Sequence, residues 1–286
     1  MSNVIWPDNL VEELAYRRCV LFLGSGVSAT AKNDEGVSPK TWGDFLKNII
    51  DLINNPSEED LKFINSMLEQ KNYLLALQAI YDLCDPGAYS KYLKDQFSRG
   101  GFNPSSVHLD IKEIDSKIVI TTNFDKIYDS ICNESQYVIY DYQRTKSIIS
   151  NIKSPENIII KAHGSIDDTD EIIFTSKQYY ENQEKYPEFY SLLKSLFQTH
   201  TVLFLGYSLS DPDINLVLQS IRNTSNSAAP HYIVIKEGVS EHIIKQWEET
   251  YNVRCLKFGH EYIKFNESIE DLKNMVLGLR EERQIP

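Results

Sequence analysis

The chain has 286 residues, 42% of them hydrophobic and 24% charged, which excludes a disordered, collagen-like or coiled-coil protein. This length is enough for one large domain or two small ones. The 29 Lys and Arg residues against 41 Asp and Glu leave a net charge of −12. Direct binding of nucleic acid by this chain is therefore disfavoured, because an acidic surface repels phosphate.

The cysteines and the terminal sequence indicate the compartment. No C-x-x-C pair is present, so we expect no metal site, zinc included, and no disulfide framework from Cys19, Cys84, Cys132 and Cys255. The first eight residues lack the basic segment and apolar run of a targeting signal, and no run reaches the ~18 apolar residues of a membrane span. We expect a cytoplasmic protein.

Short apolar runs alternate with amphipathic segments along the chain. This pattern is typical of a parallel sheet covered by helices on both faces. It predicts an α/β fold, Rossmann-like, with a mostly parallel doubly wound sheet. The strands are expected at 19–23, 117–121, 157–161, 201–205, 231–235 and 253–258, and helices at 10–18, 125–132, 188–198, 211–222, 241–250 and 269–280.

The first two expected strands are separated by almost a hundred residues, more than one crossover needs. Apolar residues at three-and-four spacing in this gap predict helices at 42–53, 58–69, 73–83 and 89–97. Turn-forming residues at 54–57 and 85–87 separate them. We therefore expect one domain over 1–286 that carries a helical insertion at about 36–105.

A glycine-rich turn follows the first strand. Gly24, Gly26 and Ala29 match G-x-G-x-x-G/A, in which glycines let the backbone approach a pyrophosphate and a helix N-terminus donates N–H groups. The alternative is a tight strand-to-helix turn with no ligand.

Three further strands end in small polar residues before an expected helix. Asn123 and Asp125 follow the second strand, where they are either aimed at a ligand crevice or cap a helix. His163 and Gly164 follow the third, where the imidazole is either a proton acceptor or a structural hydrogen-bonding group. The fourth segment runs from Gly206 to a helix start with Pro212 at its first position. Together, the four strand ends predict one continuous polar rim.

These four motifs resemble those of the sirtuins. Gly24-Ser25-Gly26-Val27-Ser28 is similar to the sirtuin nucleotide loop, and Thr121-Thr122-Asn123-Phe124-Asp125 to the sirtuin Thr-x-Asn-x-Asp segment. His163-Gly164 is similar to the catalytic His-Gly, and Gly206-Tyr207-Ser208 to the Gly-x-Ser that holds adenosine. The stretch that ends Ser-Asp-Pro-Asp at 210–213 particularly resembles sirtuin-like proteins of prokaryotic anti-phage defence, which consume NAD.

The resemblance implies a set of functional residues. Asn123 and His163 are the expected catalytic residues, and NAD, as substrate, is expected to contact Gly24, Ser25, Gly26, Ser28, Thr122, Asp125, Gly206 and Ser208. The paired cysteines of the zinc module of protein-deacetylating sirtuins are missing from this chain. The resemblance therefore supports cleavage of NAD more than deacylation.

We accordingly expect an NAD glycohydrolase that depletes NAD in antiviral defence. The alternatives are an NAD-dependent protein deacylase and a nucleotide-binding subunit without turnover. Because an uncontrolled hydrolase would deplete its own host, we expect regulation by assembly. We expect a homo-oligomer built through the helical insertion, and the resemblance implies a HerA-type ATPase or a short Argonaute as a possible partner.

Overall fold

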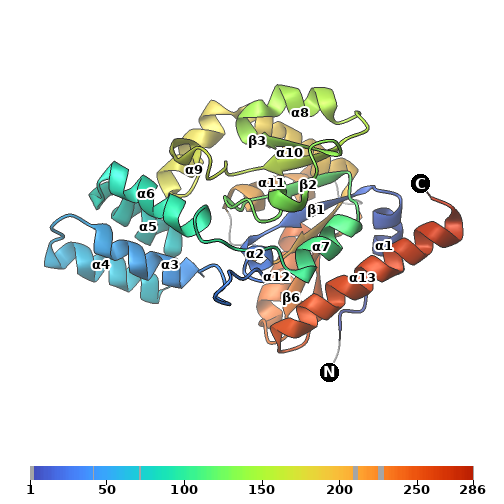
Figure 1. Cartoon of the computed structure of the whole chain (residues 1–286), viewed down its shortest axis with the longest axis horizontal. Coiled ribbons are helices and arrows are strands. Elements are labelled where there is room, and N and C mark those ends of the chain that lie inside the picture. The colour runs from blue at the N-terminus through green and yellow to red at the C-terminus, as the bar shows by residue number, and fades with distance from the viewer. Residues whose placement is uncertain (1–2, 41, 71, 209–211, 225–228, 286) are drawn as a thin grey trace.

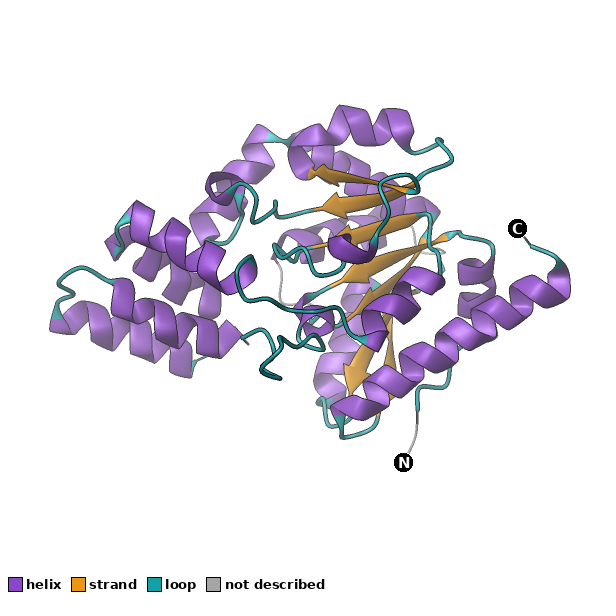
Figure 2. Ribbon diagram, viewed as in Figure 1, coloured by secondary structure: helices purple, strands orange, loops and turns teal. Residues whose placement is uncertain are grey.

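The structure, a computed structural model, describes residues 3–40, 42–70, 72–208, 212–224 and 229–285. A twisted sheet of seven strands lies between layers of helices, as Figure 2 shows. The strands are β1 (Cys19–Leu23), β2 (Ile118–Thr121), β3 (Tyr137–Asp141), β4 (Asn157–Lys161), β5 (Thr201–Leu205), β6 (His231–Lys236) and β7 (Val253–Phe258). Neighbouring strands are parallel throughout, in the order β3-β4-β2-β1-β5-β6-β7. The predicted α/β fold with a doubly wound parallel sheet is confirmed.

The strand order reverses at the centre of the sheet. After β1 the chain builds β2, β3 and β4 on one side, and then crosses to place β5 on the other side of β1. The register aligns Leu205, Leu23, Thr121 and Lys161 as the last residues of four adjacent strands. Ligands of open α/β sheets bind at such a reversal, outside the carboxyl ends of the strands.

Helices cover both faces of the sheet. On one face lie α1 (Asp8–Ala15), α7 (Ser106–Glu113) and α13 (Tyr262–Arg283), whose apolar residues share a core with alternate residues of the central strands. Figure 1 shows α13 running across this face beside α1 and α7. On the other face lie α8 (Thr145–Asn151), α10 (Pro187–Thr199), α11 (Pro212–Thr224) and α12 (Glu241–Tyr251). Fully buried strands such as β1 contribute to both cores, which is why they are apolar throughout.

A helical lobe formed by α3–α6 lies beyond the carboxyl edge of the sheet (Figure 1). Its helices are α3 (Trp42–Ile49), α4 (Glu58–Glu69), α5 (Tyr73–Leu83) and α6 (Pro86–Phe97), with a single 3-10 turn, η1 (Ile50–Leu52), after α3. Ser57 and Asp60 form a capping box at the start of α4, and Asp85 caps α6 with Pro86 at its first position. The lobe has its own apolar core, which Phe124 and Phe174 of the sheet domain join.

The expected helix at 125–132 is wrong. This segment is a turn followed by a short 3-10 helix, η2 (Asp129–Ile131). Lys161 donates from Nζ to the Asp125 carbonyl, and the Asp125 carboxylate accepts from the Ile127 amide. Neither of these is a main-chain hydrogen bond of an α-helix. The cap interpretation of Asn123 and Asp125 is therefore also wrong.

Other differences concern elements with weak patterns. The edge strand β3 was not predicted; only its Tyr137 is buried, so it lacks the continuous apolar run of the other strands. Helices α7, α8 and α9 (Ser176–Lys185) were also missed, and the last helix starts seven residues before its expected position. β4 leads into a turn and not a helix. The expected helix start at Asp211 lies outside the described residues.

Candidate active site

A cavity of about 510 Å³ lies between the carboxyl edge of the sheet and the helical lobe. This volume is within the range of ligand pockets, about 300–1,000 Å³. The loops after β1, β2, β4 and β5 all reach it, and eight of the ten predicted site residues line it: Ser25, Ser28, Thr122, Asn123, Asp125, His163, Gly206 and Ser208. The other two, Gly24 and Gly26, belong to the same loop after β1 but do not line the cavity.

Three glycines let the loops after β1 and β5 pack backbone against backbone. A Cβ on Gly24 would lie 2.5 Å from the Gly206 carbonyl oxygen, and one on Gly26 would lie 2.8 Å from the Gly206 Cα. Gly206 itself has a φ of +60°, in the left-handed region that favours glycine. The Gly26 amide donates to the Gly206 carbonyl at 2.8 Å, and the Gly24 amide donates to the Leu205 carbonyl at 2.9 Å. Both amides are thus engaged in joining the loops.

Ser28 links the two polar side chains that follow β2. Its Oγ donates to Asp125 Oδ2 at 2.7 Å and accepts from Asn123 Nδ2 at 3.0 Å. Asn123 Nδ2 also donates to the Gly24 carbonyl at 3.0 Å. These bonds use both hydrogens of the Asn123 amide nitrogen, so Oδ1 is the atom of this side chain that can accept a hydrogen bond from a ligand.

His163 approaches the cavity from the end of β4. Its side chain is buried, and its ring packs edge-on against Tyr179 at a centroid distance of 5.0 Å. The Tyr179 hydroxyl lies 3.4 Å from His163 Nδ1. Gly164, at φ +83°, turns the chain directly after the histidine, and a Cβ there would lie 2.6 Å from the Glu171 carbonyl oxygen. The imidazole is therefore held by a tight turn on one side and an aromatic ring on the other.

One part of the cavity wall is apolar. Phe45 and Phe97 of the lobe meet Phe124 and Phe174 of the sheet domain in a cluster with ring centroids 4.8–5.7 Å apart. Motif analysis missed this wall because its residues are dispersed through the sequence and resemble ordinary core positions. It also missed Tyr207, which lies inside the Gly206–Ser208 motif and stacks on Phe204.

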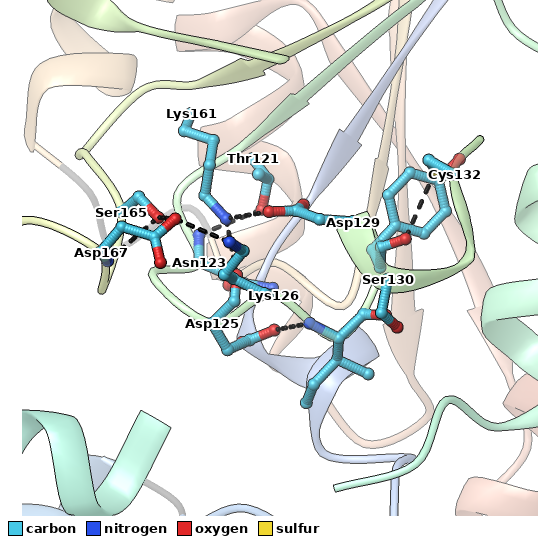
Figure 3. Close-up of polar contacts among 12 residues, drawn as sticks. Thr121, Asn123, Asp125, Lys126, Asp129, Ser130, Cys132, Lys161, Ser165 and Asp167 are labelled. Carbon is cyan, nitrogen blue, oxygen red and sulfur yellow. Dashed lines mark hydrogen bonds and ion pairs between the residues drawn. The ribbon is translucent and has the colours of Figure 1, made fainter. Parts of the chain in front are cut away.

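A second, smaller cavity of about 300 Å³ adjoins the first on the β3 and β4 side. Figure 3 shows some of its polar side chains, among them Lys126, whose Nζ binds Asp167 at 2.8 Å. This hydrogen bond raises the pKa of Lys126. Deeper in the same region, Lys161 forms an ion pair with Asp129, also at 2.8 Å, and both side chains are buried.

Within the described residues no group of three or more His, Cys, Asp and Glu side chains is arranged to hold a metal ion. The four cysteines are not joined in disulfides. No helix in the described part of the chain combines the length and apolarity needed to cross a membrane.

These features define a class of protein. A parallel sheet whose order reverses beside a glycine-rich loop, with polar strand ends around a crevice, is the architecture of Rossmann-like nucleotide-binding proteins. Within that class, residues 117–256 match the SIR2-like domain. The resemblance of the chain to sirtuin-like proteins is therefore confirmed over these residues.

Several curated proteins are similar to the chain over most of its length. Defense-associated sirtuin 2 of Bacillus subtilis is 26% identical over 210 residues, which cover 72% of this chain and 19% of that protein. The NAD(+) hydrolase ThsA of Enterococcus faecium is 24% identical over 81% of this chain and 48% of that protein. The NAD(+) hydrolase ThsA of Bacillus cereus (strain MSX-D12) is 20% identical over 82% of this chain and 46% of that protein.

The chain thus spans about half or less of the length of these curated relatives. A solved structure from work on the mechanism and regulation of Sir2 enzymes aligns with 96% of this chain and 100% of its own. The identity is 15% and the TM-score is 0.47.

Proposed function

We propose that this chain binds NAD in the larger cavity and hydrolyses its nicotinamide–ribose bond, giving nicotinamide and ADP-ribose. The observation that carries this proposal is the convergence of Asn123 and His163 on one cavity beside the loops that hold Gly24 and Gly206. The names of the ThsA relatives, which are NAD(+) hydrolases, support the same chemistry.

The cavity suits a dinucleotide in size and in the distribution of its polar groups. In this proposal the Gly206–Ser208 loop takes the adenosine end, and the exposed Ser25 hydroxyl faces the pyrophosphate. Gly24 and Gly26 contribute by bringing two loops together, since their amides bind main-chain carbonyls. Thr122 and Asp125 lie toward the nicotinamide ribose.

The proposed reaction breaks the C1′–N bond, and the electron pair passes to the pyridinium nitrogen, so nicotinamide leaves as a neutral molecule. The ribose becomes oxocarbenium-like, and water adds to C1′. Asn123 Oδ1 accepts a hydrogen bond from this water and orients it, while His163 takes its proton directly or through a ribose hydroxyl. General-base assistance of this kind is worth ~10²–10⁴-fold in rate.

Release of nicotinamide and ADP-ribose from NAD by the purified chain tests the proposal. We expect His163→Ala and Asn123→Ala to lose most of the rate. His242→Ala is the matched control, because His242 is an exposed residue of α12 that does not line the cavity. Equal rates for wild type and His163→Ala would refute the catalytic assignment.

We further propose that the protein is a cytoplasmic effector of antiviral defence that is activated by assembly. The relative named defense-associated sirtuin 2 supports the defence role. Assembly as a homo-oligomer, or with a HerA-type ATPase or a short Argonaute, would confine NAD loss to infected cells. Mass in solution and NAD turnover with and without proteins encoded nearby test this; a monomer with full activity alone would argue against it.

The apolar wall supports a second candidate function. Phe45, Phe97 and Phe174 offer a surface on which the acyl chain of an acylated lysine could pack. A protein deacylase would release nicotinamide only when an acylated peptide is present. A rate that is unchanged by added peptide would exclude this reaction.

A further inference from the structure

Lys161 is a buried cation at the end of β4, two residues before His163. Its side chain is only 2% exposed. Removing an ammonium group from water is strongly unfavourable unless charged and hydrogen-bonding partners replace the water. The position of this lysine therefore requires specific partners.

The partners of Lys161 all lie in the segment that follows β2. Nζ binds Asp129 Oδ2 at 2.8 Å and donates to the main-chain carbonyl of Asp125 at 2.6 Å. Figure 3 shows the ammonium group reaching from the strand end to this segment. The segment contains a three-residue 3-10 helix and no α-helix, and these two bonds tie it to the end of β4.

The same segment carries the polar side chains of the larger cavity. At its start, the main-chain N–H of Asn123 donates to Thr121 Oγ1 at 3.0 Å. Thr121 Oγ1 in turn donates to the Leu23 carbonyl of β1. In its middle, Lys161 holds the carbonyl of Asp125, whose carboxylate binds Ser28. At its far end, Lys161 pairs with Asp129. Residues 122–129 are thus fixed to β1 at one end and to β4 at the other.

We infer that Lys161 is a positioning residue, which together with Asp129 sets the distance between His163 and the segment that carries Asn123 and Asp125. This inference rests on the proposed function, in which Asn123 orients the attacking water and His163 takes its proton. Lys161 lines the smaller cavity and is absent from the lining of the larger one. It therefore acts through its neighbours and not by touching NAD.

A purely structural role would give the same bonds, so the test must separate stability from positioning. Lys161→Met alone leaves Asp129 buried without its cation and is expected to be unstable. The double variant Lys161→Met/Asp129→Leu removes both charges; replacing a buried ion pair by apolar residues often preserves stability. It still lacks the donor to the Asp125 carbonyl. Lys126→Met is the matched control, since its ion pair with Asp167 is nearby but exposed.

Thermal melting, steady-state kinetics and amide hydrogen exchange on the full chain decide the inference. We expect the double variant to melt near the wild-type temperature and to lose about 10²-fold in kcat for nicotinamide release, because small misplacements of reacting groups have effects of that size. KM for NAD should change little, and amide hydrogen exchange should accelerate in residues 122–131. The Lys126→Met control should match wild type in all of these measurements.

A double variant with wild-type melting, kcat and exchange would overturn the inference. If it does not fold, the isosteric Asp129→Asn carries the test, with a smaller loss of kcat and faster exchange expected; no change in either would overturn it. If wild type itself releases no nicotinamide, the proposed function fails. Hydrogen exchange then decides separately whether Lys161 holds the segment.

Discussion

Replacing Gly206 by alanine tests whether the contact between the loops after β1 and β5 holds the cavity in shape. A Cβ at this position would lie 2.7 Å from the Gly26 carbonyl carbon and closer still to the Val27 nitrogen. Ordinary contact begins at 3.4 Å, so the loops must separate by at least about 0.7 Å. The hydrogen bond from the Gly26 amide to the Gly206 carbonyl, now 2.8 Å, would then exceed the usual 2.7–3.2 Å range.

The expected cost has two parts. Left-handed backbone costs a non-glycine residue about 1–2 kcal/mol. Loss of the inter-loop hydrogen bond, with its groups left partly buried, adds about 2–3 kcal/mol. Gly101→Ala is the matched control, because Gly101 has a φ of +63° and nothing lies within 4 Å of an added Cβ. The control variant is therefore destabilised only by the left-handed backbone conformation.

Thermal unfolding and nicotinamide release measure the difference. Gly206→Ala should melt roughly 5–10 °C below Gly101→Ala, at ~2–4 °C per kcal/mol for a chain of this size class. It should also lose more activity at temperatures where both variants are folded, since the loop that we propose to contact NAD has moved. Equal melting temperatures and equal activities for the two variants would refute the reasoning.

Three further predictions concern buried polar groups. Burial lowers the pKa of His108 and of His231 from the usual 6.5 to about 4, so the unfolded chain binds more protons between these values. Stability should be fully present above pH 6.5 and fall toward pH 4 by up to about 1.4 kcal/mol per pH unit for each histidine. Urea unfolding at pH 7 and 5 checks this, and equal midpoints would contradict it. Tyr179→Phe removes the hydroxyl 3.4 Å from His163 Nδ1 but keeps the ring, so kcat should fall about fivefold, the effect of one neutral hydrogen bond, at unchanged KM. Steady-state rates at the wild-type value would show that the hydroxyl does not orient the imidazole. Ser28→Ala leaves Asn123 and Asp125 without their shared partner and should cost about 1–3 kcal/mol in thermal unfolding, with a loss of nicotinamide release. A fully stable and active variant would contradict it.

The strands were predictable because a buried parallel strand needs a continuous apolar run. All six expected strands are present within one residue of their expected bounds. The edge strand β3 was not predicted because it pairs with one neighbouring strand and mixes buried with exposed residues. Its sequence therefore lacks the continuous apolar run of the central strands. Residues 125–132 were misread as a helix because their local pattern fits one, whereas the bond from Lys161, 36 residues away in the sequence, holds the Asp125 carbonyl.

The motifs also indicated which residues gather at one edge of the sheet. Parallel strands end at the same edge, so polar residues directly after β1, β2, β4 and β5 must be neighbours once the strand order is known. The expected pyrophosphate contacts of Gly24 and Gly26 illustrate the limit of this reasoning. The sequence shows glycines at both positions and so predicts a close approach of the backbone. Only the structure shows that their amides bind carbonyls at the end of β5 and in the loop that follows it.

By itself, the sequence determined the α/β architecture, the glycine turns and the set of polar strand ends, because each depends on residues close together in the chain. The tertiary structure alone decided what surrounds them: the apolar wall from the lobe, Tyr179 beside His163, and the buried pair of Lys161 and Asp129. These contacts join segments far apart in sequence, and a side chain gives no local sign of a partner that folding brings to it. Their energies depend on burial, which exists only once the chain has folded.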